Sequence, residues 1–212
     1  MGSAGSGKGT QSELLEEQLG YHTVEAGGIF RKKAKEDSAL GRKVKEINDS
    51  GKHANDELIT ELMKDYILSV PSEEPLLLDG YPRTIGQYEM LHDLLKEGGR
   101  EPENGLAIWI NVSREEAERR LLNRSQCSVC KTVFMSREVE TCPHCGGEVN
   151  PRAYDKPESI KPRLDFFENE VMPVIEKYRG KGRLIEVDGM QEIAHVFDQI
   201  KNKLKPYMKE AE

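Results

Sequence analysis

The chain has 212 residues, of which 36% are hydrophobic and 33% are charged, and its formal net charge is −7. This length and composition predict one domain with its own core, and the acidic balance argues against a broad nucleic-acid or anionic-membrane surface. The longest apolar runs are as short as Leu76–Leu78, so we expect neither a membrane span nor a secretory leader, and we expect a cytoplasmic protein.

Apolar positions along the chain predict helices that alternate with short strands. Helices are expected over residues 10–19, 29–36, 39–50, 55–67, 85–97, 113–124, 157–178 and 193–204, and strands over 21–25, 75–79, 106–112 and 183–187. Asn55 is expected to cap one helix, Ser113 and Glu116 form a capping box, and Pro162 is expected to kink or restart its helix. The run Leu76–Leu78 fits a strand buried on both faces. This alternation predicts an α/β fold, a parallel sheet with helices on both faces.

The chain opens on a glycine-rich segment, GSAGSGKGT over residues 2–10, that is typical of a phosphate-binding loop. Its glycines free backbone N–H groups to turn inward, the helix that follows adds its positive end, and Lys8 can reach a transferred phosphoryl group. Gly9 stands where the generic pattern has Ser or Thr, so we expect Mg²⁺ to be held mainly by phosphates and water. A flexible tail rich in glycine and serine is the alternative.

The segment LLLDGYPRTIGQ over residues 76–87 carries three side chains suited to a nucleotide. Asp79, at the carboxyl end of a strand, can hold a magnesium-bound water, and Arg83 can clamp a phosphate. Gln87 offers both a donor and an acceptor for a base edge. The alternative is an ordinary strand–turn–helix with solvated polar groups.

Further arginines flank the rest of the chain. Arg120 and Arg124 lie four residues apart, and Arg152 and Arg163 stand on either side of the end of a segment without helical periodicity. Phosphoryl transfer depends on cations that converge on developing charge. Each arginine alone is typical of a solvated surface, whereas the set beside a phosphate loop indicates phosphate ligands.

Two C-x-x-C pairs, Cys127/Cys130 and Cys142/Cys145, lie within the segment 125–157. Four thiolates at this spacing predict a closed, structural zinc site. A redox dithiol is the competing interpretation. Because the segment has no helical period, we expect it to be an insertion on the α/β core.

Taken together, these segments resemble the adenylate kinases, in particular the bacterial type with a long, zinc-bearing lid. The resemblance covers nearly the whole chain and rests on GSAGSGKGTQ, SGKHANDEL, LLLDGYPRTIGQ, the arginine pair, the cysteine pairs, PRAYDKPESIKPRL and VDG. It implies a P-loop nucleoside monophosphate kinase that transfers the terminal phosphoryl group of ATP to AMP, giving two ADP, with Mg²⁺ beside ATP and structural Zn²⁺. It also implies a monomer with a core of residues 1–124 and 158–212, an acceptor-binding subdomain at 25–54 and a lid at 125–157.

The resemblance assigns residues to three roles. Those implied to bind ATP are Gly5, Ser6, Gly7, Lys8, Gly9, Thr10, Arg120, Arg124, Val133, Phe134 and Gln191. Those implied to bind AMP are Ala26, Arg31, Lys52, His53, Ala54, Gly80, Tyr81, Pro82, Arg83, Gln87, Arg152 and Arg163. Those implied to act in phosphoryl transfer are Lys8, Asp79, Arg83, Arg124, Arg152 and Arg163.

The chain departs from the family pattern around the acceptor. The family's Thr-Gly-Asp is Ala26-Gly27-Gly28 here, so a hydroxyl and a carboxylate are absent, and the paired lid aspartates are Tyr154-Asp155. Alanine at the first position is similar to UMP/CMP kinases, whereas residues 84–87 and the long lid favour AMP. The alternatives are therefore a kinase for UMP, CMP or another nucleoside monophosphate, or a non-catalytic nucleotide-binding relative. The acidic balance opposes a zinc-ribbon nucleic-acid binder.

The phosphate loop lacks the strand that normally leads into it, because only Met1 precedes Gly2. In the family's fold this strand is the central one, between those at 75–79 and 106–112, so two edges would keep unpaired backbone groups. We expect about six upstream residues, a typical strand length, to supply it. The alternatives are a sheet that closes the gap and a strand borrowed from another chain.

Overall fold

The computed structural model describes residues 1–49, 54–152 and 155–208. Its helices are α1 (Lys8–Leu19), α2 (Ala26–Lys33), α3 (Ala39–Asp49), α4 (Asp56–Leu68), α5 (Ile85–Glu97), α6 (Arg114–Asn123), α7 (Pro157–Phe166), α8 (Met172–Gly180) and α9 (Ile193–Leu204). Its strands are β1 (His22–Glu25), β2 (Leu76–Asp79), β3 (Ala107–Asn111), β4 (Ser125–Cys127), β5 (Val133–Phe134), β6 (Val149–Pro151) and β7 (Leu184–Asp188). No described helix has both the length and the apolar character needed to cross a bilayer. The predicted alternation of helices and strands is confirmed.

The central strands form two separate parallel pairs, β1 with β2 and β3 with β7. Met1 lies at the edge of β3, where its amino group donates to the carbonyl of Ile108 and its carbonyl accepts from the N–H of Ile110 at 3.0 Å. Across the described residues β2 and β3 do not pair, so the alternative of a sheet that closes the gap is wrong. The expectation that upstream residues supply a strand stays a prediction.

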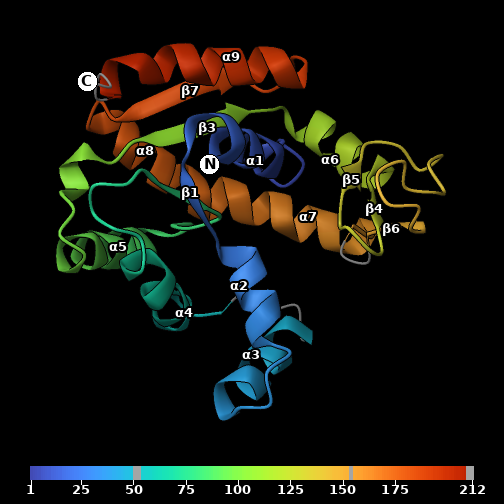
Figure 1. Cartoon of the computed structure of the whole chain (residues 1–212), viewed down its shortest axis with the longest axis horizontal. Coiled ribbons are helices and arrows are strands. Elements are labelled where there is room, and N and C mark those ends of the chain that lie inside the picture. Colours follow the sequence, from blue (N-terminus) through green and yellow to red (C-terminus); the bar gives the residue numbers. More distant parts are fainter. Residues whose placement is uncertain (50–53, 153–154, 209–212) are drawn as a thin grey trace.

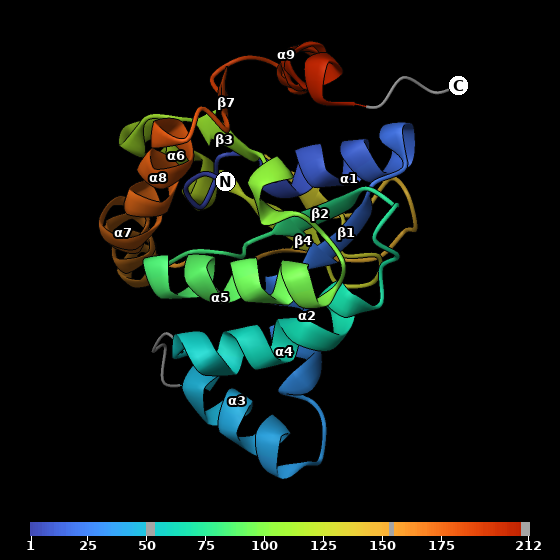
Figure 2. The ribbon, with the colours of Figure 1, turned by 90° about the vertical axis from the view of Figure 1, so that its left-hand side faces the viewer.

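Helices cover both faces of these strands, as predicted. Helices α1 and α9 lie on one side, and α5 and α4 lie on the other with α3 beyond them (Figure 2). The short strands β4–β6 form a small antiparallel sheet at one end of the molecule, next to α6 and α7, and α2 and α3 project from another side (Figure 1). The β4–β6 sheet and the α2–α3 pair thus lie outside the α/β core.

Side-chain caps set the starts of three helices, since they satisfy backbone donors that lack a partner within the helix. Asn55 accepts from the N–H of Leu58 at 3.1 Å, and Thr84 accepts from that of Gln87 at 3.1 Å. Ser113 accepts from the N–H of Glu116 at 3.2 Å. The carboxylate of Glu116 turns to neighbouring arginines instead of back to the cap, so only half of the predicted capping box forms.

The predicted restart at Pro162 is wrong, because helix α7 runs through this residue, whereas a kink there stays a prediction. An irregular turn comes later, as a π-helical segment over Phe167–Val171. Proline removes one backbone hydrogen bond here, and the helix tolerates that loss. The residues of β2 are half-buried rather than fully buried, because the edge of β2 that faces β3 has no strand beside it.

Candidate functional site

The glycine loop leads directly into α1, which begins at Lys8. Gly5 and Gly7 have φ angles of 87° and 94°, in the region that side chains disfavour. A Cβ on Gly5 would lie 2.7 Å from the carbonyl oxygen of Ala117, so the loop also requires glycine for its close approach to α6. The loop thus presents backbone N–H groups and the positive end of α1 at one place, the arrangement that binds anions.

Lys8 lies partly buried at the start of α1, and its Nζ donates to the carbonyl of Ser3 at 2.9 Å. Burial lowers the pKa of Lys8 to about 8; Asp79 opposes this shift, and the positive charges of Arg83, Arg163 and Arg124 add to it. Four cationic groups from distant segments therefore converge near the glycine loop.

Asp79 ends β2, and the turn after it lines a cavity of about 150 Å³ together with Lys8, Arg83 and Arg163. The Tyr81–Pro82 peptide bond in this turn is cis. Nε of Arg83 donates to the carbonyl of Gly80 at 2.7 Å, which fixes the guanidinium over the turn. Predicted phosphate ligands from the loop, the β2 turn and α7 thus share one cavity.

Gln87 is buried, and the protein already engages both ends of its amide. Its Oε1 accepts from the backbone N–H of Arg83 at 2.8 Å, and its Nε2 donates to Asp56 at 2.9 Å. A nucleotide base bound by Gln87 would have to share the amide oxygen and nitrogen with Arg83 and Asp56. The predicted role of Gln87 in base recognition stays a prediction.

Asp155 clamps two of the arginines. Its carboxylate, which is 2% exposed, accepts from Nε and Nη2 of Arg124 at 2.7 and 3.0 Å and from Nη1 of Arg163 at 2.8 Å. Burial alone would raise the pKa of Asp155, but the hydrogen bonds from both arginines hold the pKa below its usual value. One carboxylate therefore sets the directions of two guanidinium groups from different elements. Arg152 lies close enough that the charges of Arg124 and Asp155 act on its guanidinium.

Other predicted ATP ligands lie on separate elements. Arg120 donates to Glu116 at 2.7 Å and to the carbonyl of Gly189 at 2.9 Å, so it points toward the loop after β7. Gln191 lies on that loop and donates to Asp188 at 3.2 Å. The pair in β5, Val133 and Phe134, lies in the small sheet, and its place in an ATP site stays a prediction.

Several of the predicted acceptor residues lie next to β1 or β2 along the chain. Ala26 opens α2, and Arg31 in the same helix donates through Nη2 to both carboxylate oxygens of Glu25, at 3.2 and 3.3 Å. Ala54 directly precedes the cap of α4. Lys52 and His53 lie outside the described residues.

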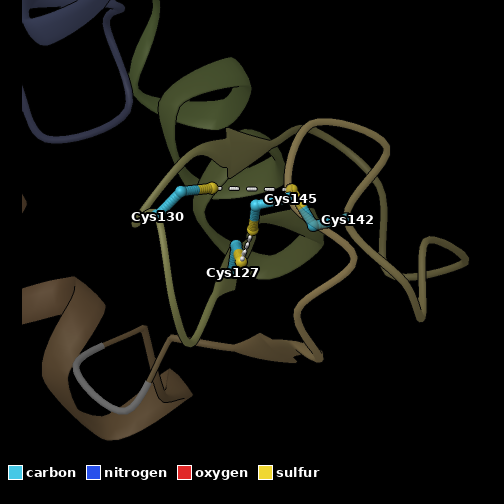
Figure 3. A group of neighbouring side chains, drawn as sticks. All are labelled: Cys127, Cys130, Cys142 and Cys145. Carbon is cyan, nitrogen blue, oxygen red and sulfur yellow. Dashed lines mark hydrogen bonds between the residues drawn. The ribbon is translucent and has the colours of Figure 1, made fainter.

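The four cysteines meet at one point in the small sheet (Figure 3). Their sulfur atoms all lie within 4.8 Å of one another, and the pairs Cys127–Cys145 and Cys130–Cys142 are 3.5 Å apart. Sulfur atoms about 2.3 Å from one tetrahedral zinc ion are roughly 3.8 Å apart, close to these distances. The cluster can therefore hold a metal ion, with one cysteine of each pair buried and one exposed.

Sequence reasoning gave no role to three acidic residues of the site. Asp155 accepts hydrogen bonds from two arginines, and Asp56 accepts one from a glutamine. These partners belong to other elements of the chain, so no local pattern marks the pairs. Glu25 had a weak signal, since it ends a strand two residues before a pair of glycines. All three acids are hydrogen-bonded to residues that the sequence predicts to bind a nucleotide.

The glycine loop, the parallel strands and the cationic cavity at their carboxyl ends define a P-loop phosphotransferase. A family model described as adenylate kinase matches residues 1–183. The chain belongs to the adenylate kinase family.

Curated relatives agree over almost the full chain. An adenylate kinase of Dehalococcoides mccartyi is 35% identical over 209 residues, which cover 97% of this chain and 96% of the relative. An adenylate kinase of Methanocella arvoryzae is 35% identical over 209 residues, 96% of each chain. One from Caldicellulosiruptor bescii is 35% identical over 205 residues, 94% of each chain.

Proposed function

We propose that this protein transfers the terminal phosphoryl group of ATP to AMP, giving two ADP, and that the reaction is reversible. The observation that carries the proposal is the meeting of Lys8 with Arg83 and Arg163 around one cavity beside Asp79. Family membership and relatives named adenylate kinase support the same reaction. A site for moving a phosphoryl group between two nucleotides requires cations on both the donor and the acceptor side, and the chain supplies both.

On the donor side, the loop N–H groups and the Lys8 ammonium would neutralise the ATP phosphates. Arg124 and Arg163, held by Asp155 at 2.7–3.0 Å, would face the transferring group in orientations set before substrate arrives. Mg²⁺ bound with ATP would offset charge on the phosphate oxygens, and Asp79 is the carboxylate suited to hold it through water.

On the acceptor side, Arg31 and Arg83 would hold the AMP phosphate in line with the terminal phosphorus of ATP. An oxygen of that phosphate attacks the phosphorus, the bond to the bridging oxygen of ATP breaks, and ADP departs from each side. No side chain has to take a proton, so the protein contributes position and charge.

We propose that the lid at 125–157 and the subdomain at 25–54 close over the nucleotides and exclude water, which would otherwise accept the phosphoryl group. In the lid, Cys127, Cys130, Cys142 and Cys145 would hold structural Zn²⁺, for which four thiolates at the observed distances are suited. The domain division, monomeric state and cytoplasmic location stay predictions from the sequence.

The test is a coupled assay of ADP formation with MgATP and, in turn, AMP, UMP, CMP and GMP. AMP is expected to be turned over with the highest kcat/KM. Fastest turnover of UMP or CMP would replace AMP as the acceptor, in line with alanine at position 26. Tight ATP binding without ADP formation from any acceptor would refute the proposal and indicate a non-catalytic relative.

A further inference from the structure

Glu25 occupies a place in the site that no assigned role covers. It is the last residue of β1 and lies opposite Asp79, the last residue of β2, in the parallel register. Both carboxylates therefore belong to the edge of the strands at which open α/β sheets bind ligands.

The carboxylate of Glu25 packs over the first turn of α2. A Cβ on Gly27 would lie 2.8 Å from Oε1 of Glu25, and a Cβ on Gly28 would lie 2.5 Å from Oε2. A Cβ at either position would force the Glu25 carboxylate to shift, so the glycine pair lets this acid keep its present place. The space that a residue at position 28 would use is filled by Glu25.

In this position Glu25 holds Arg31. Nη2 of Arg31 donates to both carboxylate oxygens at 3.2 and 3.3 Å. A guanidinium has five N–H donors, so an arginine held through one nitrogen keeps donors for a phosphate. The charge of Glu25 also acts on Arg83, where, with Asp79, it partly offsets the lowering of the Arg83 pKa by burial. The charge of Glu25 thus acts on both arginines of the proposed acceptor site.

The ion pair is too exposed to be important for stability. Both side chains are 47% exposed, and an ion pair this exposed contributes little to stability. Its effect is therefore to be sought in the orientation of Arg31 rather than in the free energy of unfolding.

We infer that Glu25 is the positioning residue of the acceptor site, holding Arg31 for the AMP phosphate and replacing, from the end of β1, the carboxylate absent at position 28. This inference rests on the proposed function. It also explains why glutamate at position 25 and glycine at position 28 occur together, because a side chain at position 28 would displace the Glu25 carboxylate from its present place.

The experiment measures KM for AMP, KM for ATP and kcat in three variants and in the unchanged protein. Glu25→Gln is expected to raise KM for AMP roughly tenfold, the effect of about 1.4 kcal/mol from one charge-assisted hydrogen bond, with kcat and KM for ATP within about twofold. Glu25→Ala combined with Gly28→Asp, which moves the carboxylate to position 28, is expected to recover most of that loss. The matched control is Glu36→Gln, which removes an ion pair to Lys33 in the same region and changes the net charge equally; its KM values should not move.

An unchanged or lowered KM for AMP in Glu25→Gln, while the unchanged protein forms ADP from AMP, overturns the inference alone. Equal changes in both KM values and kcat, or a fall in melting temperature beyond that of Glu36→Gln, would indicate a merely structural role and also overturn it. Absence of ADP formation by the unchanged protein is a different outcome, and it refutes the proposed function and this inference together.

Discussion

Fusing four apolar, β-prone residues ahead of Met1 is expected to raise the melting temperature by roughly 10–30 °C, because stability of a domain this size changes by 2–4 °C per kcal/mol. The target is the slot between the two strand pairs. It is lined by Met1, Leu77, Ile108 and Ile110, among others, and the backbone of Met1 already has the register of a strand along β3. Leu77 and Ile108 are only partly buried there.

The magnitude follows from what each added residue would gain. Two backbone hydrogen bonds contribute about 1 kcal/mol each, and a newly buried apolar side chain contributes about 1.5–3 kcal/mol. Ordering the backbone and the side chain of the residue costs about 2.5–3 kcal/mol. The net gain is about 1–2 kcal/mol per residue, or about 4–8 kcal/mol for four residues.

The assay is thermal unfolding followed by circular dichroism, with a control fusion of the same length that alternates aspartate and proline. Both fusions turn the buried amino group of Met1 into an amide, so their difference isolates the strand. Equal melting temperatures for the two fusions would refute the reasoning, because the slot would then not accept a strand.

Three further predictions concern single groups of the site. Above pH 8, where Lys8 loses its proton in the free protein, KM for ATP should rise, and Lys8→Met should lower kcat/KM by roughly 100-fold or more; an unchanged kcat/KM would remove Lys8 from the mechanism. Stability should change in the other direction from ATP binding. Between pH 8 and 10.5 the unfolded chain keeps the Lys8 proton and the folded chain has lost it, so the free energy of unfolding should rise with pH over this range. Lys8→Met should lack this rise. Asp155→Asn should lower the free energy of unfolding by about 3 kcal/mol, since Arg124 and Arg163 lose their shared partner, and an unchanged urea midpoint would contradict the clamp. Cys142→Ser should release zinc to a colorimetric chelator and lower the melting temperature, and retention of one zinc per chain would contradict the four-cysteine site.

Much of the fold was predictable from local signals. Caps such as Asn55 and Thr84 act on N–H groups three residues away, so the sequence specifies them directly. The glycine loop and the two C-x-x-C pairs are likewise short patterns whose spacing is itself the chemical requirement. Periodicity located the strands but not their exposure, and for that reason β2 was expected to be buried on both faces.

By itself, the sequence determined the helices and strands of the α/β core, the phosphate loop, the metal-binding pairs and the family, because each depends on residues close together along the chain, whereas the small strands β4–β6 were not predicted. Only the tertiary structure decided that the sheet stands as two pairs, that Asp155 joins Arg124 to Arg163, and that Glu25 fills the space over Gly28. These arrangements depend on which side chains meet across the fold. The orientation of a carboxylate and the free volume next to a glycine are set by packing between elements, so they cannot be inferred from the order of residues along the chain.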